Sequence, residues 1–296
     1  MNKKFAVIVN PAAGKGNSIR ELPKLQSIFD NYAIDYDFYL TKEPRHATQI
    51  TRSIKNNYDA LIVFGGDGTI NEVVNGLIGS EIPLGIIPHG RGNDFVRSID
   101  IRNNYKKAVR ALLDYQVKKI DVGRINDVHF VNGIGVGLDG YINEESQNPG
   151  RKGIFSNRLV YIWTLLKAWL KWSSVPLRVE IDGKLAMEDH AYLVAIGNGR
   201  ACGGGILLNP DAILDDGKLD VNFVSDIPKA KLLYKFHALL NGKINTIREV
   251  NQFIGKKIRI ISEQRLPIHY DGEVFNSGNN EIMINTIPRA INVLTG

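Results

Sequence analysis

The stretch of sequence that decides the fold is Ala60-Leu61-Ile62-Val63-Phe64-Gly65-Gly66-Asp67-Gly68-Thr69-Ile70-Asn71-Glu72. Its apolar start predicts a buried strand, and the apolar-periodic segment at 71–78 predicts a helix. The glycines between them predict a tight turn, in which backbone N–H groups and the positive end of the helix bind an anion. A carboxylate at Asp67 repels phosphate, so it suits a turn that holds Mg²⁺ or handles the proton of an attacking hydroxyl. The alternative is a plain turn with Asp67 as the helix N-cap.

Two more glycine turns follow apolar runs in the first part of the chain. One is Asn10-Pro11-Ala12-Ala13-Gly14-Lys15-Gly16, and the other is Pro88-His89-Gly90-Arg91-Gly92-Asn93-Asp94-Phe95. Around them the pattern predicts alternating strands at 5–9, 34–40, 60–64 and 84–87 and helices near 17–30, 45–56, 71–78 and 103–115. This alternation predicts a doubly wound parallel sheet, with the three turns at the carboxyl ends of its strands, where ligands bind.

After Asp121 the pattern changes to short runs rich in β-branched residues. We expect strands at 128–134, 176–181, 190–196, 218–224, 257–261, 267–270 and 281–284. Turn signals separate several of these runs, namely Asp182-Gly183, Asp216-Gly217 and Asp271-Gly272. The second part of the chain is therefore expected to form a mostly antiparallel β domain.

The three glycine turns, in this order, resemble the diacylglycerol kinase catalytic domain of bacterial lipid kinases, a family that shares its fold with NAD kinases. The resemblance continues over nearly the whole chain, through Asp121-Val122-Gly123, Gly197-Asn198-Gly199, Gly203-Gly204-Gly205, Pro210-Asp211-Ala212, Asp216-Gly217-Lys218-Leu219 and Asp271-Gly272-Glu273. It implies a nucleotide-binding α/β domain at 1–122, to which a C-terminal tail at about 286–296 returns. It also implies a β-sandwich domain for lipid and metal at 123–285, with the active site between the two.

The resemblance implies that one set of residues surrounds the phosphates and ribose of ATP. This set consists of Asn10, Pro11, Ala12, Ala13, Gly14, Thr41, Gly66, Asp67, Gly68, Thr69, Ile70, Asn71, Glu72 and Arg91. The chain departs from the family at two of these positions. Ala13 stands where a serine or threonine is usual, so one hydroxyl contact is absent, and Arg91 stands where threonine is usual, so it would reach phosphate as a charged donor.

The resemblance also implies roles for carboxylates. Asp67, Asp94 and Asp121 would form a network that helps to hold Mg²⁺ and water, because carboxylates in one crevice need a cation or proton between them. As alternatives, Asp94 is a helix N-cap and Asp121 a loop residue. Glu273 would be the general base that takes the proton of the acceptor hydroxyl, with Asp67 as the competing base. The alternative for Glu273 is a solvated strand residue after an Asp271-Gly272 hairpin turn.

A second, structural Mg²⁺ site is implied at Ile213-Leu214-Asp215-Asp216-Gly217-Lys218. Asp216 would give its carboxylate, and Ile213 and Lys218 would give their backbone carbonyls. Few protein ligands with several waters are normal for Mg²⁺. A plain Asp-Gly turn is the alternative.

Composition limits the other classes. The 296 residues are 44% hydrophobic and 23% charged, as in an ordinary globular protein, and the net charge of +6 permits attraction to anionic lipids or nucleotides. One cysteine, Cys202, allows no intrachain disulfide and fits a reducing cytosol. We expect no signal peptide and no spanning helix. The scattered histidines give no zinc-ligand spacing, and no Walker sequence or serine nucleophile elbow occurs.

The segment Ser156–Trp172 is expected to form a helix that carries all three tryptophans together with Lys167 and Lys171. Tryptophan and lysine side chains together favour a membrane–water interface. The alternative is a helix packed on the β domain through these aromatic residues.

The sequence therefore predicts a cytoplasmic, peripherally membrane-associated lipid kinase. It would use ATP and Mg²⁺ to phosphorylate diacylglycerol or a similar lipid alcohol, giving phosphatidic acid and ADP, without binding nucleic acid. An NAD kinase and a non-catalytic nucleotide- or lipid-binding regulator are the alternatives. The identity of the lipid alcohol stays open, as does a homodimer.

Overall fold

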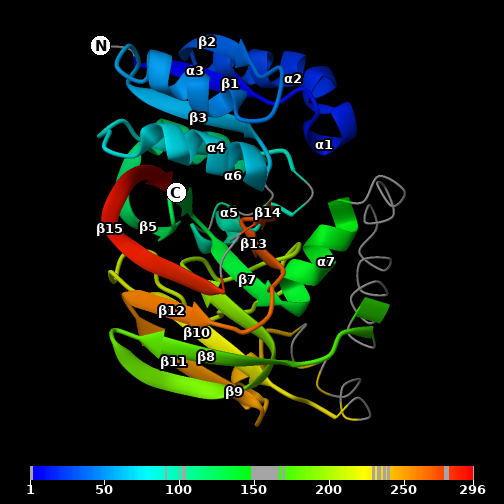
Figure 1. Cartoon of the computed structure of the whole chain (residues 1–296). Coiled ribbons are helices and arrows are strands. Elements are labelled where there is room, and N and C mark those ends of the chain that lie inside the picture. Colours follow the sequence, from blue (N-terminus) through cyan, green and yellow to red (C-terminus); the bar gives the residue numbers. More distant parts are fainter. Residues whose placement is uncertain are drawn as a thin grey trace. The chain divides into compact units, whose positions relative to one another are not determined.

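The computed structural model describes residues 3–90, 92–99, 101, 105–147, 167–168, 171–228, 231, 235, 238, 241–276 and 280–295. The chain divides into two compact units, and the long strand β15 (Glu281–Thr295) pairs with strands of both (Figure 1). Unit 1 comprises Met1–Val122 and Pro288–Gly296, and unit 2 comprises Gly123–Ile287.

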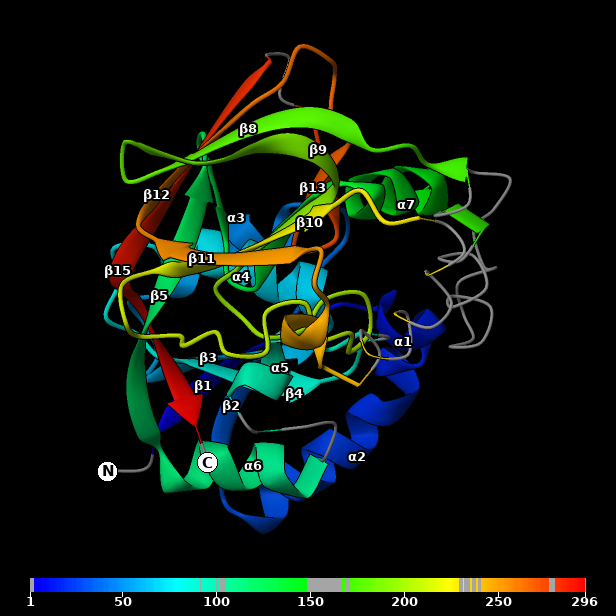
Figure 2. The ribbon, with the colours of Figure 1, turned by 90° about the horizontal axis from the view of Figure 1, so that it is seen from below.

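Unit 1 is built on a parallel sheet with the strand order β15-β4-β3-β1-β2. Its strands are β1 (Lys4–Val9), β2 (Asp35–Leu40), β3 (Ala60–Gly65), β4 (Leu84–Pro88) and the C-terminal end of β15 (Glu281–Thr295). Its helices are α1 (Ala13–Gly16), α2 (Ser18–Asn31), α3 (His46–Ile54), α4 (Asp67–Leu77), α5 (Phe95–Ser98) and α6 (Tyr105–Asp114). Helices α2 and α6 cover one face of the sheet, and α3 and α4 cover the other (Figure 2).

The central strands of unit 1 are apolar because both of their faces are covered. All six residues of β3 are buried, as are all five residues of β4. Such continuous apolar runs are typical of parallel strands between two layers of helices. The helix expected at 71–78 begins earlier, at Asp67, because it continues directly from Gly66, which is its N-cap.

Unit 2 is a mostly antiparallel β structure with the strand order β14-β13-β7-β9-β8-β12-β15, to which β10 and β11 add beside β9. Its strands are β7 (Gly133–Gly137), β8 (Val175–Ile181), β9 (Lys184–Gly197), β10 (Leu219–Ser225), β11 (Val250–Gly255), β12 (Lys257–Ile261), β13 (Ile268–Tyr270), β14 (Glu273–Phe275) and the first part of β15. The end of β5 (Gln116–Ile125) pairs with β6 (Val128–Phe130). Helix α7 (Leu138–Gln147) and the short η3 (Ile244–Thr246) complete the described elements.

The strand expected at 128–134 is two strands, β6 and β7, and the reason is a side chain. The carboxylate of Asp271 accepts hydrogen bonds from the N–H groups of Val131, Asn132 and Gly133 at 2.8–2.9 Å. Because the chain between β6 and β7 bonds to this side chain, its N–H groups do not join a strand ladder there.

Candidate functional site

Two glycine turns of unit 1 touch through their backbones. A Cβ on Gly66 would lie 2.9 Å from the Cα of Gly90, and one on Gly90 would lie 2.5 Å from the Cα of Gly66. No side chain fits at either position, so the turns after β3 and β4 approach more closely than other residues allow. Gly14, with φ of 58°, brings the first turn equally close to His89, whose Nε2 would lie 2.8 Å from an added Cβ.

Side-chain hydrogen bonds tie the same turns together. The amide of Asn10 donates to Thr69 Oγ1 at 3.0 Å, and its Oδ1 accepts from the N–H of Ala12 at 2.9 Å. Asn93, with φ of 49°, folds its own turn by bonding both the N–H and the carbonyl of Gly90. The three turns predicted from sequence therefore meet at one edge of the sheet of unit 1.

Asp67 and Asp94 are brought together at this edge. Asp67 Oδ1 accepts hydrogen bonds from the N–H groups of Asp94 at 2.8 Å and Phe95 at 3.3 Å. Both carboxylates lie against Gly92, where an added Cβ would be 2.9 Å from Asp67 Oδ2 and 3.3 Å from Asp94 Oδ2. Neither acts as a simple N-cap: Gly66 is the N-cap of α4, and Asp94 is at the N-cap position of α5 without a side-chain cap bond.

The amino end of α4 is suited to an anion. No side chain caps this helix at Gly66, so no capping group competes for the N–H groups of its first turn. The N–H groups and the helix dipole favour negative charge there, while Asp67 brings a carboxylate to the same end. An anion and a carboxylate at one place call for a cation, which fits a phosphate bound with Mg²⁺.

Asp121 lies within unit 1 on β5 and is fully buried. Its Oδ1 accepts a hydrogen bond at 2.8 Å from the N–H of Arg289, which has φ of 50°. Asp121 therefore fastens the C-terminal segment to unit 1. Asp121 lies in a strand, and the alternative prediction of a loop residue is wrong.

The other predicted nucleotide contacts have varied surroundings. Ile70 is buried in the core, so only its backbone can face a ligand, and Thr41 donates its N–H to Val9. The two carboxylate oxygens of Glu72 accept from the N–H groups of Arg45 and Ala47 at 2.9 and 3.0 Å, which caps α3. Arg91 lies outside the described residues.

His89 was missed as a candidate by sequence reasoning. Its ring packs on Phe64 with centroids 4.7 Å apart, and burial lowers its pKa, against a small opposing effect of Glu21. Its Nε2 is buried and has no hydrogen-bond partner among the described residues. The signal was its position directly after β4, inside the third glycine turn.

In unit 2 the predicted metal residues lie in an acidic turn. Asp216 Oδ1 accepts from the N–H of Lys218 at 2.9 Å, and Ile213 is exposed. Burial, together with the nearby charges of Asp216 and Asp211, raises the pKa of Asp220 to about 6. Asp220 was also missed, and the negative field around it is the electrostatic environment that attracts a divalent cation.

Glu273 is the first residue of β14 and is exposed. It pairs with Tyr270 across a two-residue turn made by Asp271 and Gly272, with φ of 45° and 89°. The alternative interpretation of the motif predicted this hairpin. The hairpin geometry does not exclude the predicted role, because an exposed carboxylate at the start of a strand is accessible to a substrate.

The helix expected at Ser156–Trp172 lies mostly outside the described residues, and so does Trp163. Lys167 and Lys171 are exposed. Trp172 packs on unit 2: its ring lies 5.2 Å from that of Tyr141, and its Nε1 donates to the carbonyl of Tyr192 at 3.1 Å. For Trp172, the alternative prediction of packing against the β domain is confirmed. No helix in the described part of the chain is long and apolar enough to cross a membrane.

Comparison with known proteins places the chain in a family. The profile described as "Diacylglycerol kinase catalytic domain" matches residues 4–125, and the one described as "YegS C-terminal NAD kinase beta sandwich-like domain" matches residues 132–295. The chain belongs to the diacylglycerol kinase family. A diacylglycerol kinase of Staphylococcus aureus (strain MRSA252) is 31% identical over 279 residues, covering 92% of this chain and 87% of the relative. One of Staphylococcus carnosus is 30% identical, with 92% and 89% covered.

Solved structures confirm the fold. A diacylglycerol kinase from Bacillus anthracis superposes with a TM-score of 0.73 at 28% identity, covering 99% of this chain and 97% of the other. An NAD kinase from Archaeoglobus fulgidus, solved with ATP, gives a TM-score of 0.54 at 14% identity, with 98% and 93% covered, and this likeness concerns the fold alone. The predicted fold class, an α/β domain followed by a β-sandwich, is confirmed, as is the family resemblance.

Proposed function

We propose that this member of a kinase family transfers the γ-phosphoryl group of ATP to the hydroxyl of diacylglycerol or a related lipid alcohol. The observation that carries the proposal is the Asp67 carboxylate, which lies at the amino end of α4 and is bonded to the N–H of Asp94. In a chain of the diacylglycerol kinase family, this arrangement suits a phosphate with a divalent cation.

The glycine turns of unit 1 would bind the phosphates of ATP. Asn10, Gly14 and Gly66 would lie at the phosphates. At the two glycines the turns pack so closely that an added Cβ would strike the neighbouring turn, and the bare backbone there would be able to approach a phosphate. Asp67 and Asp94 would take the cation that accompanies the phosphates. Positioning and charge neutralisation supply most of the catalysis in phosphoryl transfer.

Mg²⁺ fits the donors that are present. Carboxylate oxygens are its preferred ligands. Burial, together with the charges of Asp216 and Asp211, raises the pKa of Asp220, and a cation would relieve the repulsion among these carboxylates. Asp216 and Asp220 would hold a structural ion in unit 2, with the carbonyls of Ile213 and Lys218. Near the phosphates, Mg²⁺ would neutralise the charge that builds up on the transferred group.

Glu273 would act as general base. Its carboxylate would take the proton of the lipid hydroxyl while that oxygen forms a bond to the γ-phosphorus, the bond to the β-phosphate oxygen breaks, and ADP leaves. Asp67 is the competing base. Its Oδ1 already accepts two backbone N–H groups, whereas Glu273 is exposed, and this difference favours Glu273.

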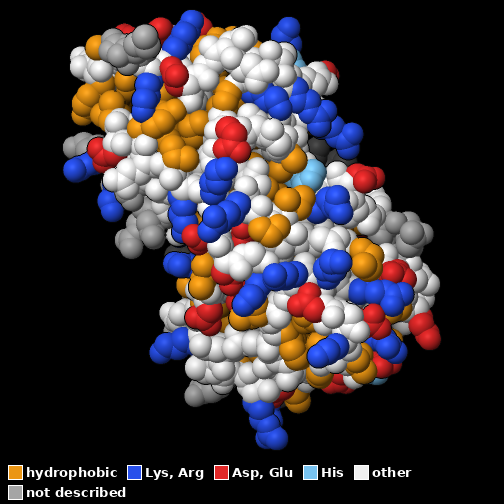
Figure 3. Space-filling view, turned by 90° about the vertical axis from the view of Figure 1, so that its left-hand side faces the viewer, with side chains coloured by type: hydrophobic (Ala, Val, Ile, Leu, Met, Phe, Trp, Pro, Cys, Tyr) orange, Lys and Arg blue, Asp and Glu red, His pale blue; other side chains and the backbone are white. Residues whose placement is uncertain are grey.

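A lipid substrate requires contact with a bilayer surface. The net charge of +6 favours attraction to anionic lipids. Lys and Arg side chains are spread over the whole face shown in Figure 3 rather than gathered in one patch. Peripheral, charge-assisted binding in the cytoplasm is therefore part of the proposal, with Lys167 and Lys171 as the first residues to test.

The test is incubation of the purified protein with radiolabelled ATP and Mg²⁺ and a panel of acceptors. The panel contains diacylglycerol, ceramide, a prenol and NAD, and products are separated by chromatography. We expect label in a lipid phosphate, with most in phosphatidic acid. Label in NADP would show an NAD kinase, and no label in any product would show a non-catalytic binding protein.

A further inference from the structure

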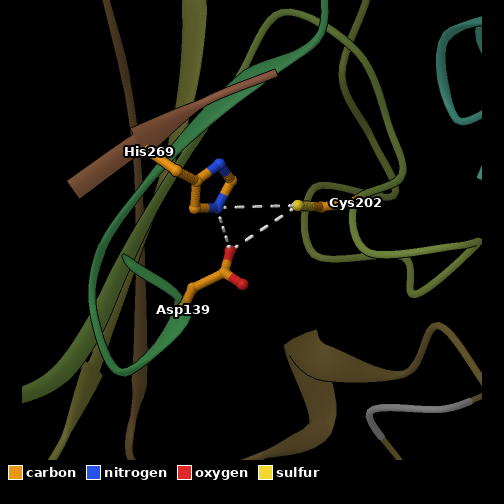
Figure 4. A group of neighbouring side chains, drawn as sticks. All are labelled: Asp139, Cys202 and His269. Atoms are coloured by element: carbon orange, nitrogen blue, oxygen red, sulfur yellow. Dashed lines mark hydrogen bonds and ion pairs between the residues drawn. The ribbon is translucent and has the colours of Figure 1, made fainter. Parts of the chain in front are cut away.

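Three side chains of unit 2 that the proposed chemistry does not use meet beneath the hairpin that carries Glu273. They are Asp139 on α7, Cys202 in the loop after β9, and His269 on β13 (Figure 4). His269 Nε2 lies 2.8 Å from Asp139 Oδ2, and Cys202 Sγ lies 3.6 Å from the same oxygen. His269 is 1% exposed, so this network belongs to the interior of the unit.

The other ring nitrogen of His269 fixes its tautomer. The N–H of Gly272 points at His269 Nδ1 at 3.3 Å. A backbone N–H can only donate, so Nδ1 is the acceptor and the proton of the neutral ring is on Nε2. Nε2–H therefore donates to Asp139, and the ring connects that carboxylate to the hairpin turn.

Asp139 accepts hydrogen bonds in this arrangement. Burial raises the pKa of Asp139, but the electrostatic attraction and hydrogen bond of the His269 N–H, with the thiol of Cys202, outweigh burial and hold that pKa below its usual range. Gly135 makes room for the pair, because a Cβ there would overlap both His269 Nε2 and Asp139 Oδ2. The carboxylate is thus a fixed acceptor that orients the ring.

We propose that His269, oriented by Asp139, is a positioning residue that sets the place of Glu273. The hairpin turn is held from two sides: Asp271 bonds the N–H groups of 131–133, and His269 bonds the N–H of Gly272. Glu273 directly follows Gly272, so the bond from Gly272 to the His269 ring helps to fix the position of the Glu273 backbone, from which the carboxylate extends. The inference rests on the proposed role of Glu273 as general base, and its first test does not.

A metal ion is the competing use of these side chains. Among the residues that the structure describes, their potential ligand atoms form the one such group, within 4.8 Å of one another. A metal on Nε2 would displace its proton to Nδ1. That proton would then face the N–H of Gly272, donor against donor, so the hydrogen-bonded network fits the geometry better.

The first test measures the network itself in the full chain by NMR. Ring nitrogen shifts should report the Nε2–H tautomer for His269, and the Gly272 amide should exchange slowly with solvent. In Asp139→Asn the new amide can donate to Nε2, which favours the Nδ1–H tautomer and speeds exchange at Gly272. His190→Asn, an exposed histidine on β9, is the matched control and should change neither. An Nδ1–H tautomer in the wild type would overturn the proposal.

The second test measures turnover. His269→Asn keeps an acceptor near the position of Nδ1, whereas His269→Gln places its amide near the position of Nε2 and leaves Gly272 without an acceptor. We expect kcat to fall about tenfold to a hundredfold in His269→Gln and Asp139→Asn with KM for ATP unchanged, and His269→Asn to recover much of the loss. Equal loss in both histidine variants, or a loss that appears in KM alone, would contradict positioning.

Cys202→Ser separates the network from a metal site. A serine hydroxyl can still donate to Asp139 but is a poor zinc ligand, so we expect activity and the Gly272 exchange rate to be kept. Stoichiometric zinc in the purified protein, lost together with activity in Cys202→Ser, would replace the proposal with a metal site. If the wild type phosphorylates no acceptor, the proposed function fails, and the NMR test still decides whether His269 holds the turn.

Discussion

Asp67 Oδ1 accepts a hydrogen bond from the backbone N–H of Asp94 at 2.8 Å. This one bond fastens the turn after β3 to the turn after β4, so the residue expected to carry charge chemistry also holds the shape of the site. Charge and shape are therefore separable at Asp67 by the choice of substitution.

Asp67→Asn should reduce lipid phosphorylation by about a hundredfold, because it removes the charge while its Oδ1 can still accept the two N–H bonds. Asp67→Ala should lose a similar amount of activity and also lower the melting temperature, since the N–H of Asp94 loses its acceptor. Turnover assays and thermal melts check both. Asp114→Asn, in an exposed ion pair on α6, is the control and should match the wild type. A wild-type rate in Asp67→Asn would remove Asp67 from the chemistry.

Glu273→Gln should also lower kcat by about a hundredfold, because an amide cannot take the proton of the lipid hydroxyl. The side chain is exposed at the start of β14, so the melting temperature should not change. Steady-state kinetics with diacylglycerol in mixed micelles measure the effect. Near-normal activity would move the base to Asp67.

The steric contact between Gly66 and Gly90 predicts the effect of Gly66→Ala. Gly66 has φ of −104°, which alanine adopts, so the new Cβ acts only through its approach to Gly90. Overpacking of this kind costs about 1–3 kcal/mol. We expect a lower melting temperature and weaker ATP binding by calorimetry, and an unchanged ATP affinity would show that the turns do not form the phosphate site.

The acidic turn of unit 2 should make Mg²⁺ binding depend on pH. The pKa of Asp220 is raised to about 6 in the fold, above its ordinary value. Below that pH the folded protein holds a proton on Asp220 more tightly than the unfolded chain does. The free energy of unfolding of the metal-free protein should therefore fall as pH rises through about 6. In the proposed site Mg²⁺ would bind the ionised form of Asp220, so the stabilising effect of Mg²⁺ should be large at pH 7.5 and small at pH 5.

Asp220→Asn provides the check on this account. It should raise the melting temperature of the metal-free protein at pH 7.5 and shrink the increase that Mg²⁺ produces. Asp216→Ala should weaken the Mg²⁺ effect and lower activity, with partial rescue at high Mg²⁺. If neither Mg²⁺ nor EDTA changes the melting temperature of the wild type, unit 2 holds no structural Mg²⁺ and the proposed metal site is wrong.

Membrane binding should depend on charge. Changing Lys167 and Lys171 to glutamate should weaken sedimentation with anionic liposomes, because each lysine near such a surface contributes about 1 kcal/mol before screening. Lys184 and Lys256, also exposed, changed to glutamate provide a charge-matched control. Equal binding of the Lys167/Lys171 variant and the wild type to neutral and anionic vesicles would assign this segment to packing, as already found for Trp172.

The sequence was sufficient for the fold class because its signals are local. A buried run such as Ala60–Phe64 followed by glycines defines a strand and a turn by itself. The extent of β9 was underestimated because its first half is largely exposed and shows no regular alternation of apolar and polar residues, and only its pairing with β8 extends it. The C-terminal strand β15 was cut short at 284 because residues 285–290 are half-exposed or exposed, although the strand continues through the buried residues 291–294 to Thr295.

The candidate site was predictable where motif residues are neighbours in sequence and not where contacts cross the chain. The bond between Asn10 and Thr69 spans 59 residues, and that between Asp139 and His269 spans 130. No rule based on the spacing of residues in the sequence predicts contacts between residues so far apart. The sequence gives no zinc-ligand pattern for the same reason, although folding brings Asp139, Cys202 and His269 together.

The most direct measurement of the central claim is the stoichiometry of transfer with diacylglycerol, ATP and Mg²⁺. Phosphatidic acid and ADP are quantified in one reaction of the wild type, with Asp67→Asn beside it. The account predicts one phosphatidic acid for each ADP in the wild type and about a hundredfold less of both in the variant. ADP released without phosphatidic acid, or equal rates in the two proteins, would contradict it.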